Sequence, residues 1–514
     1  MYVYDKYLIN LFHLNPSLNV YDYKKYKNTP NIYSTKYKKQ INKLDKNYIK
    51  YLKNINNKNS YEKILEYDLI NSKSYINYDL LPLNIYNNIY IEYILNTRGK
   101  HNYKFNSKDD YLDYIEYLKL LDKITDNIIK LLKRGIKENI KYSKIIVIEF
   151  INYFNYIINN NKYKHFKTIP NSIRSRFNKS IELYLVKNIK RFVNFLENEY
   201  INYTNNKIGF CCLKNGKKEY LHLLKLYTYK TLTPEKIINI AKKELAKSLK
   251  NLDKIKNKLK FKGSLNDLQK YIFNNDNFKY KTNKELIDDL KRVKSKTYKI
   301  INKNFHKVDI DFDYDIKISN KIEYGLSVYY KTNKEKKGIF FVKNKDILNK
   351  NEIYVLSLHE GNPGHNYEYL INKNRLPMYF KFNYYDGFSE GWATYVESLM
   401  ESNNLYELFY QEIYNLFRII RLFIDVGIHY YTWDFNKAYN FYNKYLEFDS
   451  FFIKEEIIRC ISNPGQLLSY KIGQLLISKY KYKFLKKNNN IKDFHKLILD
   501  IGPCPLDILI ENLK

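Results

Sequence analysis

The chain is 514 residues long, which is enough to bury a large core and to form two to four domains. It carries 89 Lys and Arg against 54 Asp and Glu, a formal net charge of +35. The lysines are spread along the chain rather than gathered in one arm, so we expect no specific nucleic-acid partner and only weak adhesion to polyanions at low salt. A disulfide scaffold is excluded, because adjacent cysteines pair poorly and the four cysteines show no CxxC spacing: Cys211, Cys212, Cys460 and Cys504.

Codon composition explains much of the residue usage. The chain has only four alanines, whereas Lys, Asn, Ile, Tyr and Phe, whose codons are rich in A and T, are abundant. An A/T-biased genome accounts for this pattern. Residues with G/C-rich codons are then informative where they gather, as four of the 15 glycines do within 31 positions: Gly361, Gly364, Gly387 and Gly391.

Most of the chain is predicted to be helical. Apolar residues recur at three- and four-residue spacing in segments 111–132, 180–200, 234–259 and 405–428. Thr233 followed by Pro234 is a typical helix start. Asn- and Lys-rich stretches such as 24–60 are expected to be loops. Residues 1–205 contain no site motif and are expected to form an N-terminal helical lobe, with residues 206–514 as a second region that holds the motifs described below.

No segment is predicted to enter a membrane. The N-terminus lacks a basic region followed by a long apolar run. The most apolar segment, 145–158, contains Glu149 and is too short to span a bilayer. We therefore expect a soluble, cytoplasmic protein without a membrane partner.

One strand signal stands out among the helices. The β-branched and aromatic run Gly338–Val342 precedes the glycine-rich window, and segment 324–330 (YGLSVYY) could pair with it across a polar turn at 332–337. The edge of such a sheet could hold an extended peptide by main-chain hydrogen bonds. An ordinary hairpin is the alternative.

The segment from His359 to His365 (HEGNPGH), with Glu390 25 residues further on, holds the residue types of a zinc hydrolase site. Imidazole nitrogen and carboxylate oxygen are the ligands of catalytic Zn²⁺, and Glu360 could take a proton from the attacking water. The two histidines are six residues apart, so on a regular helix they would point away from each other. Pro363 must break the helix and could swing His365 back. The alternative is two surface histidines beside a Pro-Gly turn.

Several motifs in order resemble the DUF885 family, largely helical proteins related to zinc metallopeptidases. They are HEGNPGH, FSEGWATYVE, RIIRLFIDVGIHYYTW, NPGQLLSYKIG and FHKLILDIGPCPLDIL, and block 209–237 is similar as well. The resemblance implies a mainly α, two-lobed zincin-like fold of the gluzincin type, with a small hairpin beside the cleft. It implies His359, His365 and Glu390 as ligands of one Zn²⁺ per chain and Glu360 as general base.

Two positions around this motif refine the resemblance. Glu397 lies seven residues after Glu390 on the same helical face, where it could support a ligand histidine or be a solvated residue. The family often has a second His and a Gln just after the motif, whereas this chain has Asn366 and Glu368. That difference leaves the ligand set intact and bears on substrate preference.

Peptide hydrolysis also needs a group that stabilises the oxyanion. His429 and Tyr470 are the candidates. Substrate carboxylates are bound well by Arg, and Arg418, Arg421 and Arg459 stand out in a chain whose cations are mostly Lys. Each of these residues has a structural alternative, as a buried Arg–Asp pair or a core Tyr.

The sequence favours a zinc-dependent peptidase that hydrolyses short peptides, in the manner of a carboxypeptidase or dipeptidase. A catalytically degenerate scaffold that binds peptides or proteins is the alternative from another class. A polyanion-binding protein would need clustered basic residues, which are lacking. A metal-assisted hydrolase of esters or other amides is also consistent with these residues.

Overall fold

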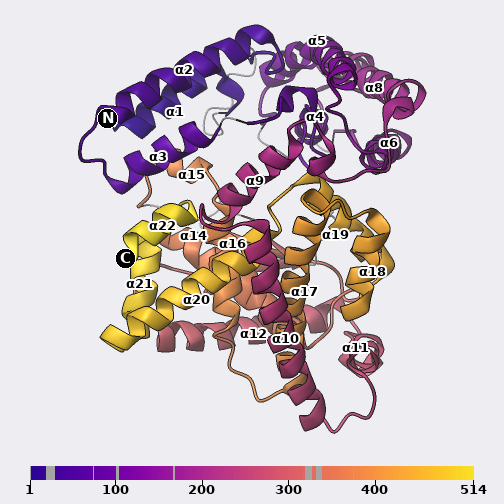
Figure 1. The fold of residues 1–514 in the computed structure, drawn as a ribbon. Helices are drawn as coiled ribbons and strands as arrows, with labels where there is room; N and C mark the ends of the chain where they lie inside the picture. The colour runs from indigo at the N-terminus through magenta and orange to yellow at the C-terminus, as the bar shows by residue number, and fades with distance from the viewer. Residues whose placement is uncertain are drawn as a thin grey trace. The chain divides into compact units, whose positions relative to one another are not determined.

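The computed structural model describes residues 2–18, 29–72, 74–99, 103–165, 168–318, 327–330, 338–373 and 375–514. Helices dominate these residues, which confirms the expected mainly α class (Figure 1). A small three-stranded sheet accompanies them. The chain divides into two compact units, Met1–Glu219 and Tyr220–Lys514. Among the described residues, we find no helix with the length and apolar character that a membrane crossing needs.

The first unit is built from helices alone in its described part. They are α1 (Val3–Leu14), α2 (Thr35–Lys53), α3 (Ser60–Asn71), α4 (Ile89–Thr97), α5 (Lys108–Glu138), α6 (Lys144–Asn159), α7 (Asn171–Ser180), the π-helical η4 (Ile181–Val186) and α8 (Lys187–Asn198), with short 3₁₀ turns η1 (Pro16–Leu18), η3 (Tyr78–Leu80), η5 (Tyr200–Tyr203) and η6 (Phe210–Cys212). The helix α9 (Gly216–Tyr227) spans the boundary of the two units.

The expectation of a loop over 24–60 is wrong for α2. Ser34 caps this helix, since its side chain accepts a hydrogen bond from the Tyr37 backbone N–H. Lys is a good helix former, and Leu52 is fully buried on the inner side. Polar composition alone therefore did not distinguish a solvated amphipathic helix from a loop.

Tyrosines fill much of the core of the first unit. The rings of Tyr93 and Tyr117 stack with 4.2 Å between centroids. The Tyr93 hydroxyl donates to the Tyr117 carbonyl at 3.0 Å, and the Tyr90 hydroxyl donates to Thr125 Oγ1 at 2.9 Å. A buried tyrosine is stable when its hydroxyl has such a partner. The abundance of tyrosine that an A/T-biased genome produces is therefore compatible with a packed interior.

The second unit carries the motifs. Its helices are α10 (Pro234–Lys258), α11 (Leu265–Asn274), α12 (Asn283–Asn304), α13 (Ile353–Leu356), α14 (His365–Lys373), α15 (Met378–Phe382), α16 (Asp386–Glu397), α17 (Leu405–His429), α18 (Phe435–Tyr445), α19 (Ser450–Ser462), α20 (Leu468–Asn488), α21 (Ile491–Ile501) and α22 (Leu506–Asn512), with the 3₁₀ turn η7 (Asp276–Phe278) and the π-helical η8 (Ser357–Gly361). Thr233 caps α10 and Pro234 is its first residue, as predicted.

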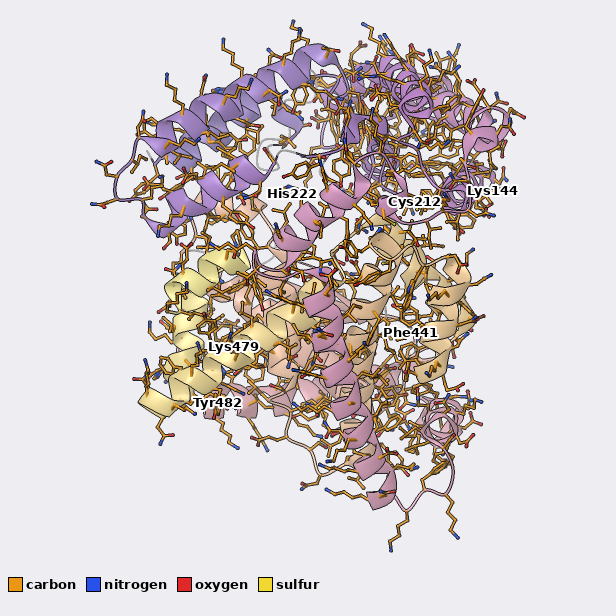
Figure 2. The ribbon with its side chains drawn as sticks, in the orientation of Figure 1. Lys144, Cys212, His222, Phe441, Lys479 and Tyr482 are labelled. Carbon is orange, nitrogen blue, oxygen red and sulfur yellow. The ribbon has the colours of Figure 1, made fainter. Side chains whose placement is uncertain are left out.

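Glycines allow a close contact between α16 and α20 in this unit. A Cβ at Gly391 on α16 would lie 2.6 Å from the Cα of Gly473 on α20, and a Cβ at Gly473 would lie 2.2 Å from the Gly387 carbonyl oxygen. The two helices therefore touch through their backbones, which side chains would prevent. Lys479 and Tyr482, further along α20, are exposed to solvent (Figure 2).

The sheet has the strand order β1 (Tyr314–Ile318), β3 (Gly338–Val342) and β2 (Ser327–Tyr330). Strand β2 pairs with β3 in antiparallel fashion, which confirms the predicted pairing over Ser327–Tyr330. Residues 324–326 and the predicted turn 332–337 lie outside the described residues. Strand β1 pairs with β3 in parallel and was not predicted, because its five residues include the charged Asp315 and Lys317.

Candidate metal centre

The HEGNPGH motif is a broken helix. Residues Ser357–Gly361 form the π-helical turn η8, Asn362 is extended with φ −112° and ψ 132°, and α14 begins at His365. This confirms the predicted break at the Pro-Gly step. The amide of Asn362 anchors the break, since its Nδ2 donates to the Phe312 carbonyl at 3.1 Å.

The chain folds back on itself at Gly364. A Cβ there would lie 1.9 Å from the His359 carbonyl oxygen and 2.3 Å from that of Leu358. No other residue type would fit without moving the backbone. The indole of Trp392 also holds this turn, because its Nε1 donates to the Pro363 carbonyl at 2.9 Å. The turn thereby brings His365 back toward His359.

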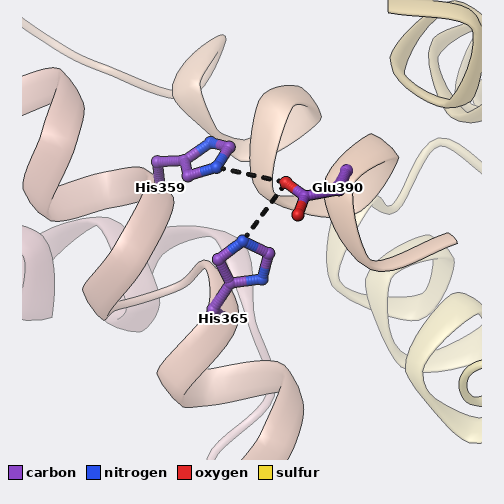
Figure 3. A group of neighbouring side chains, drawn as sticks. All are labelled: His359, His365 and Glu390. Carbon is purple, nitrogen blue, oxygen red and sulfur yellow. Dashed lines mark ion pairs between the residues drawn. The ribbon is translucent and has the colours of Figure 1, made fainter. Parts of the chain in front are cut away.

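The two histidines and Glu390 converge, as Figure 3 shows. Nε2 of His359 and Nε2 of His365 each lie 3.5 Å from Oε2 of Glu390. The centroids of the two imidazole rings are 4.9 Å apart, and the ring planes are nearly perpendicular, at 87°. Each side chain offers one ligand atom, and the three atoms lie within 4.8 Å of one another. Their type and spacing fit a divalent metal ion.

Hydrogen bonds from outside the cluster orient His359 and Glu390. The Nδ1 atom of His359 lies 2.7 Å from Oε1 of Glu397, which leaves Nε2 turned to the cluster. Glu397 in turn accepts two hydrogen bonds from Arg418, at 2.6 and 2.8 Å. The Tyr384 hydroxyl donates to Oε1 of Glu390 at 2.9 Å, which leaves Oε2 for the cluster.

The cluster is strongly coupled electrostatically. Burial alone would raise the pKa of Glu390, but His365 and His359 hold that pKa well below its usual value. Burial alone would lower the pKa of His359, but Glu390 and Glu397 raise it to about 9. Protons and a divalent cation therefore compete for the same imidazole nitrogens. Glu360 follows His359 in η8 and is half-buried.

Tyr470 lies beside this cluster. Its ring is parallel to the His359 imidazole, with 6.4 Å between centroids and 12° between planes. Its hydroxyl accepts a hydrogen bond from Nη2 of Arg459 at 2.8 Å. Arg459 also donates to Oε1 of Gln466 at 3.1 Å. Of the two oxyanion candidates, Tyr470 is the one that the structure brings next to a candidate ligand.

His429 belongs to a different buried group. Its Nε2 lies 2.9 Å from the Cys460 carbonyl oxygen, and burial lowers its pKa to about 4. Asp425 and the Cys460 thiol complete this group, whose ligand-type atoms also lie within 4.8 Å of one another. Tyr220 stacks on His429 and donates to Asp425 at 2.7 Å. All four side chains are fully buried and hydrogen-bonded, which indicates a core network.

The three candidate substrate-binding arginines differ in their partners. Arg418 and Arg421 are buried, and each forms two hydrogen bonds to one carboxylate, Glu397 and Glu456 respectively. Only Arg459 is half-buried. The ion-pair alternative that the sequence left open therefore applies to Arg418 and Arg421, with Glu rather than Asp as partner.

Sequence reasoning missed Tyr384, Gln466 and Asp386. Tyr384 is one of 56 tyrosines, so nothing in the sequence distinguished it. Gln466 joins Arg459 to Asp386, because its Nε2 donates to Asp386 Oδ1 at 2.8 Å. Burial raises the pKa of Asp386 to about 6. Gln466 lies in the NPGQ motif, which was the available signal.

A family model described as a bacterial protein of unknown function, DUF885, matches residues 17–513. The chain belongs to the DUF885 family. The match reaches through the N-terminal region, where the sequence analysis found no site motif. DUF885 membership therefore extends over nearly the whole chain.

Two solved structures share the DUF885 chain's fold. One is a "putative lipoprotein" from Colwellia psychrerythraea, with a TM-score of 0.86 and 18% identity over 99% of this chain and 97% of that chain. The other is a "putative lipoprotein of unknown function" from Shewanella oneidensis, with a TM-score of 0.73 and 13% identity over 99% of this chain and 98% of that chain. At sequence identities this low, the structural similarity establishes a shared fold alone. No curated protein matches the chain.

Proposed function

We propose that this chain is a zinc-dependent peptidase of the gluzincin type, with one Zn²⁺ per chain. The observation that carries the proposal is the convergence of His359, His365 and Glu390, with Glu397 bonded to the far nitrogen of His359. Two imidazoles and a carboxylate are a common protein ligand set of catalytic zinc. A carboxylate behind a ligand histidine is the usual means of fixing its orientation.

The ion would polarise the scissile carbonyl and make water more acidic. Glu360, adjacent to His359 on η8, takes the proton from the attacking water and passes it to the leaving amine. Tyr470 is the oxyanion donor that we favour. Its oxygen accepts from Arg459, so its own O–H remains available to donate to the substrate. His429 is set aside because Cys460 already engages its Nε2.

The substrate class that we propose is short peptides, and the location is the cytoplasm. The location rests on the sequence expectation, and the name borne by the two similar structures makes a lipid-anchored location the competing one. Fractionation of native cells with an antibody to the chain tests this point.

Metal analysis tests the proposal most directly. Elemental analysis should find about one zinc per chain in the wild type and none in His359→Ala or Glu390→Gln. Glu360→Gln should retain zinc and lose at least about 10²-fold in peptide hydrolysis, the usual contribution of a general base. Glu401→Gln, at an exposed surface pair with Lys303, is the matched control.

The contrary outcome is equally clear. Wild-type protein that contains no zinc and binds none when it is added would overturn the enzyme proposal. The degenerate peptide-binding scaffold would then be the better account of the same fold.

A further inference from the structure

The arginines near the metal centre differ in how fully their charge is compensated. The Arg418 side chain is 7% exposed and donates through both Nη atoms to Glu397. Arg421 is 6% exposed and donates through Nε and Nη2 to Oε2 of Glu456, at 3.0 and 2.8 Å. Both guanidinium groups are already matched to a buried carboxylate, so neither leaves a buried charge uncompensated.

Arg459 is in a different situation. Its side chain is 28% exposed, and its nearest carboxylate oxygen is Oε1 of Glu456, 3.7 Å from Nη1, which is too long for a hydrogen bond. That carboxylate already serves Arg421. The hydrogen bonds of Arg459 use Nη2 alone and go to the neutral acceptors Tyr470 and Gln466. Within the described part of the chain, neither Nη1 nor Nε of Arg459 has a hydrogen-bond partner.

The position of Arg459 relative to the ligands is also defined. Its Nη2 bonds the hydroxyl end of Tyr470, whose ring lies parallel to the ligand imidazole of His359. One tyrosine side chain therefore separates the guanidinium from the metal centre. An extended peptide covers about 3.5 Å per residue, so this span corresponds to about one or two residues of substrate.

We propose that Arg459 binds the C-terminal carboxylate of the peptide substrate, so that the protein releases one or two residues from the C-terminal end. This inference rests on the proposed peptidase function and specifies its substrate class. Both two-donor edges of a guanidinium include Nη2, and Nη2 of Arg459 is already engaged. The contact that we propose is therefore a charge-assisted hydrogen bond from Nη1 to one carboxylate oxygen. Gln466 and Tyr470 both accept from Nη2 and so orient the guanidinium, and the Gln466 amide donates in turn to Asp386.

The test compares N-acetylated short peptides that differ only at the C-terminus, as free acid or as amide. For the wild type we expect kcat/KM to be at least about 10-fold higher for the free acid, the size of one hydrogen bond to a charged group. In Arg459→Gln the acid-to-amide ratio should fall to within about threefold of one. Arg459→Lys, which keeps the charge but not the planar fork, should lie between.

The ratio separates recognition from positioning. Because Arg459 also holds Tyr470, its loss lowers turnover of both peptides, but only a carboxylate receptor changes their ratio. Arg292→Gln, at an exposed pair with Asp289 on α12, should leave the ratio unchanged. Equal hydrolysis of acid and amide by the wild type, or an unchanged ratio in Arg459→Gln, would overturn the inference and leave the peptidase proposal intact.

If no peptide is cleaved, that result counts against the proposed peptidase function and not against the role of Arg459. Calorimetric measurement of peptide binding then tests the role of Arg459. The wild type should then bind the free-acid peptide more tightly than the amide, and Arg459→Gln should bind both alike. Absence of any preference for the acid would overturn the role of Arg459.

Discussion

His359 is bound through both of its nitrogen atoms, and this decides its chemistry. Nε2 faces Glu390 and Nδ1 faces Glu397, whose charge is matched by Arg418. The sequence placed Glu397 on the correct helical face but left its role open. The contact with Nδ1 required η8 and α16 to pack together, which local spacing does not describe.

Glu397→Gln should weaken metal binding. The amide keeps the shape but removes the charge that orients His359 and pairs with Arg418, so we expect zinc affinity to fall by about 10- to 100-fold. Competition with a chromophoric chelator measures this, with circular dichroism to verify folding. Glu401→Gln should bind zinc as the wild type does. An unchanged affinity in Glu397→Gln would show that Glu397 serves only Arg418.

His495 should make stability depend on pH. It is fully buried between the Tyr395 hydroxyl and the Asn304 carbonyl, and burial lowers its pKa to about 4. The folded pKa is below the unfolded value of about 6.5, so its contribution is complete above pH 6.5 and is lost as pH falls toward 4. Between pH 7.5 and 5, urea unfolding should show the wild type losing about 2 kcal/mol more than His495→Gln. Equal losses would contradict the buried neutral state.

At the scale of elements, the prediction succeeded where a residue type restricts the backbone locally. Pro363 and Gly364 required a break in the helix, and Thr233–Pro234 marked a helix start; both are present. Prediction failed where composition was the only guide, as in α2, and where pairing depends on distant residues, as in β1. The glycines of α16 were noticed as a cluster, but their partner on α20 was not.

Gly391→Ala should disturb the α16–α20 contact. Its Cβ would lie 2.6 Å from the Gly473 backbone, and overpacking of this kind costs about 2 kcal/mol. Because Glu390 is the adjacent residue, zinc content should fall as well. Urea unfolding and elemental analysis measure the two effects. Ser478→Ala, further along α20, is the control and should change neither. A fully stable, zinc-replete Gly391→Ala protein would mean that the helices can separate at no cost.

At the scale of the whole molecule, fold is conserved with little identity. A TM-score of 0.86 accompanies 18% identity, because the apolar periodicity that builds helices tolerates replacement of one apolar residue by another. The same tolerance allowed Tyr and Ile to fill the core and Lys to cover the surface. We therefore expect the charge of +35 to reflect surface lysines rather than a nucleic-acid site.

A positive charge that is spread over the surface predicts binding to nucleic acid without sequence specificity. Fluorescence anisotropy should detect binding to duplex DNA at about 50 mM salt and none by about 200 mM, with equal affinity for two unrelated sequences. A complex that persists at the higher salt and prefers one sequence would restore nucleic-acid binding as a function of this chain.

The sequence by itself determined the helical class, the family, the helix break and the residues that could form a metal cluster, because each depends on residue type and near neighbours along the chain. Only the tertiary structure decided which candidates meet. It paired Arg418 with Glu397, enclosed His429 with Cys460, and left Arg459 beside Tyr470 with donors to spare. These contacts join different helices, at separations of 21, 31 and 11 residues along the chain, and burial and charge compensation arise only when those helices pack.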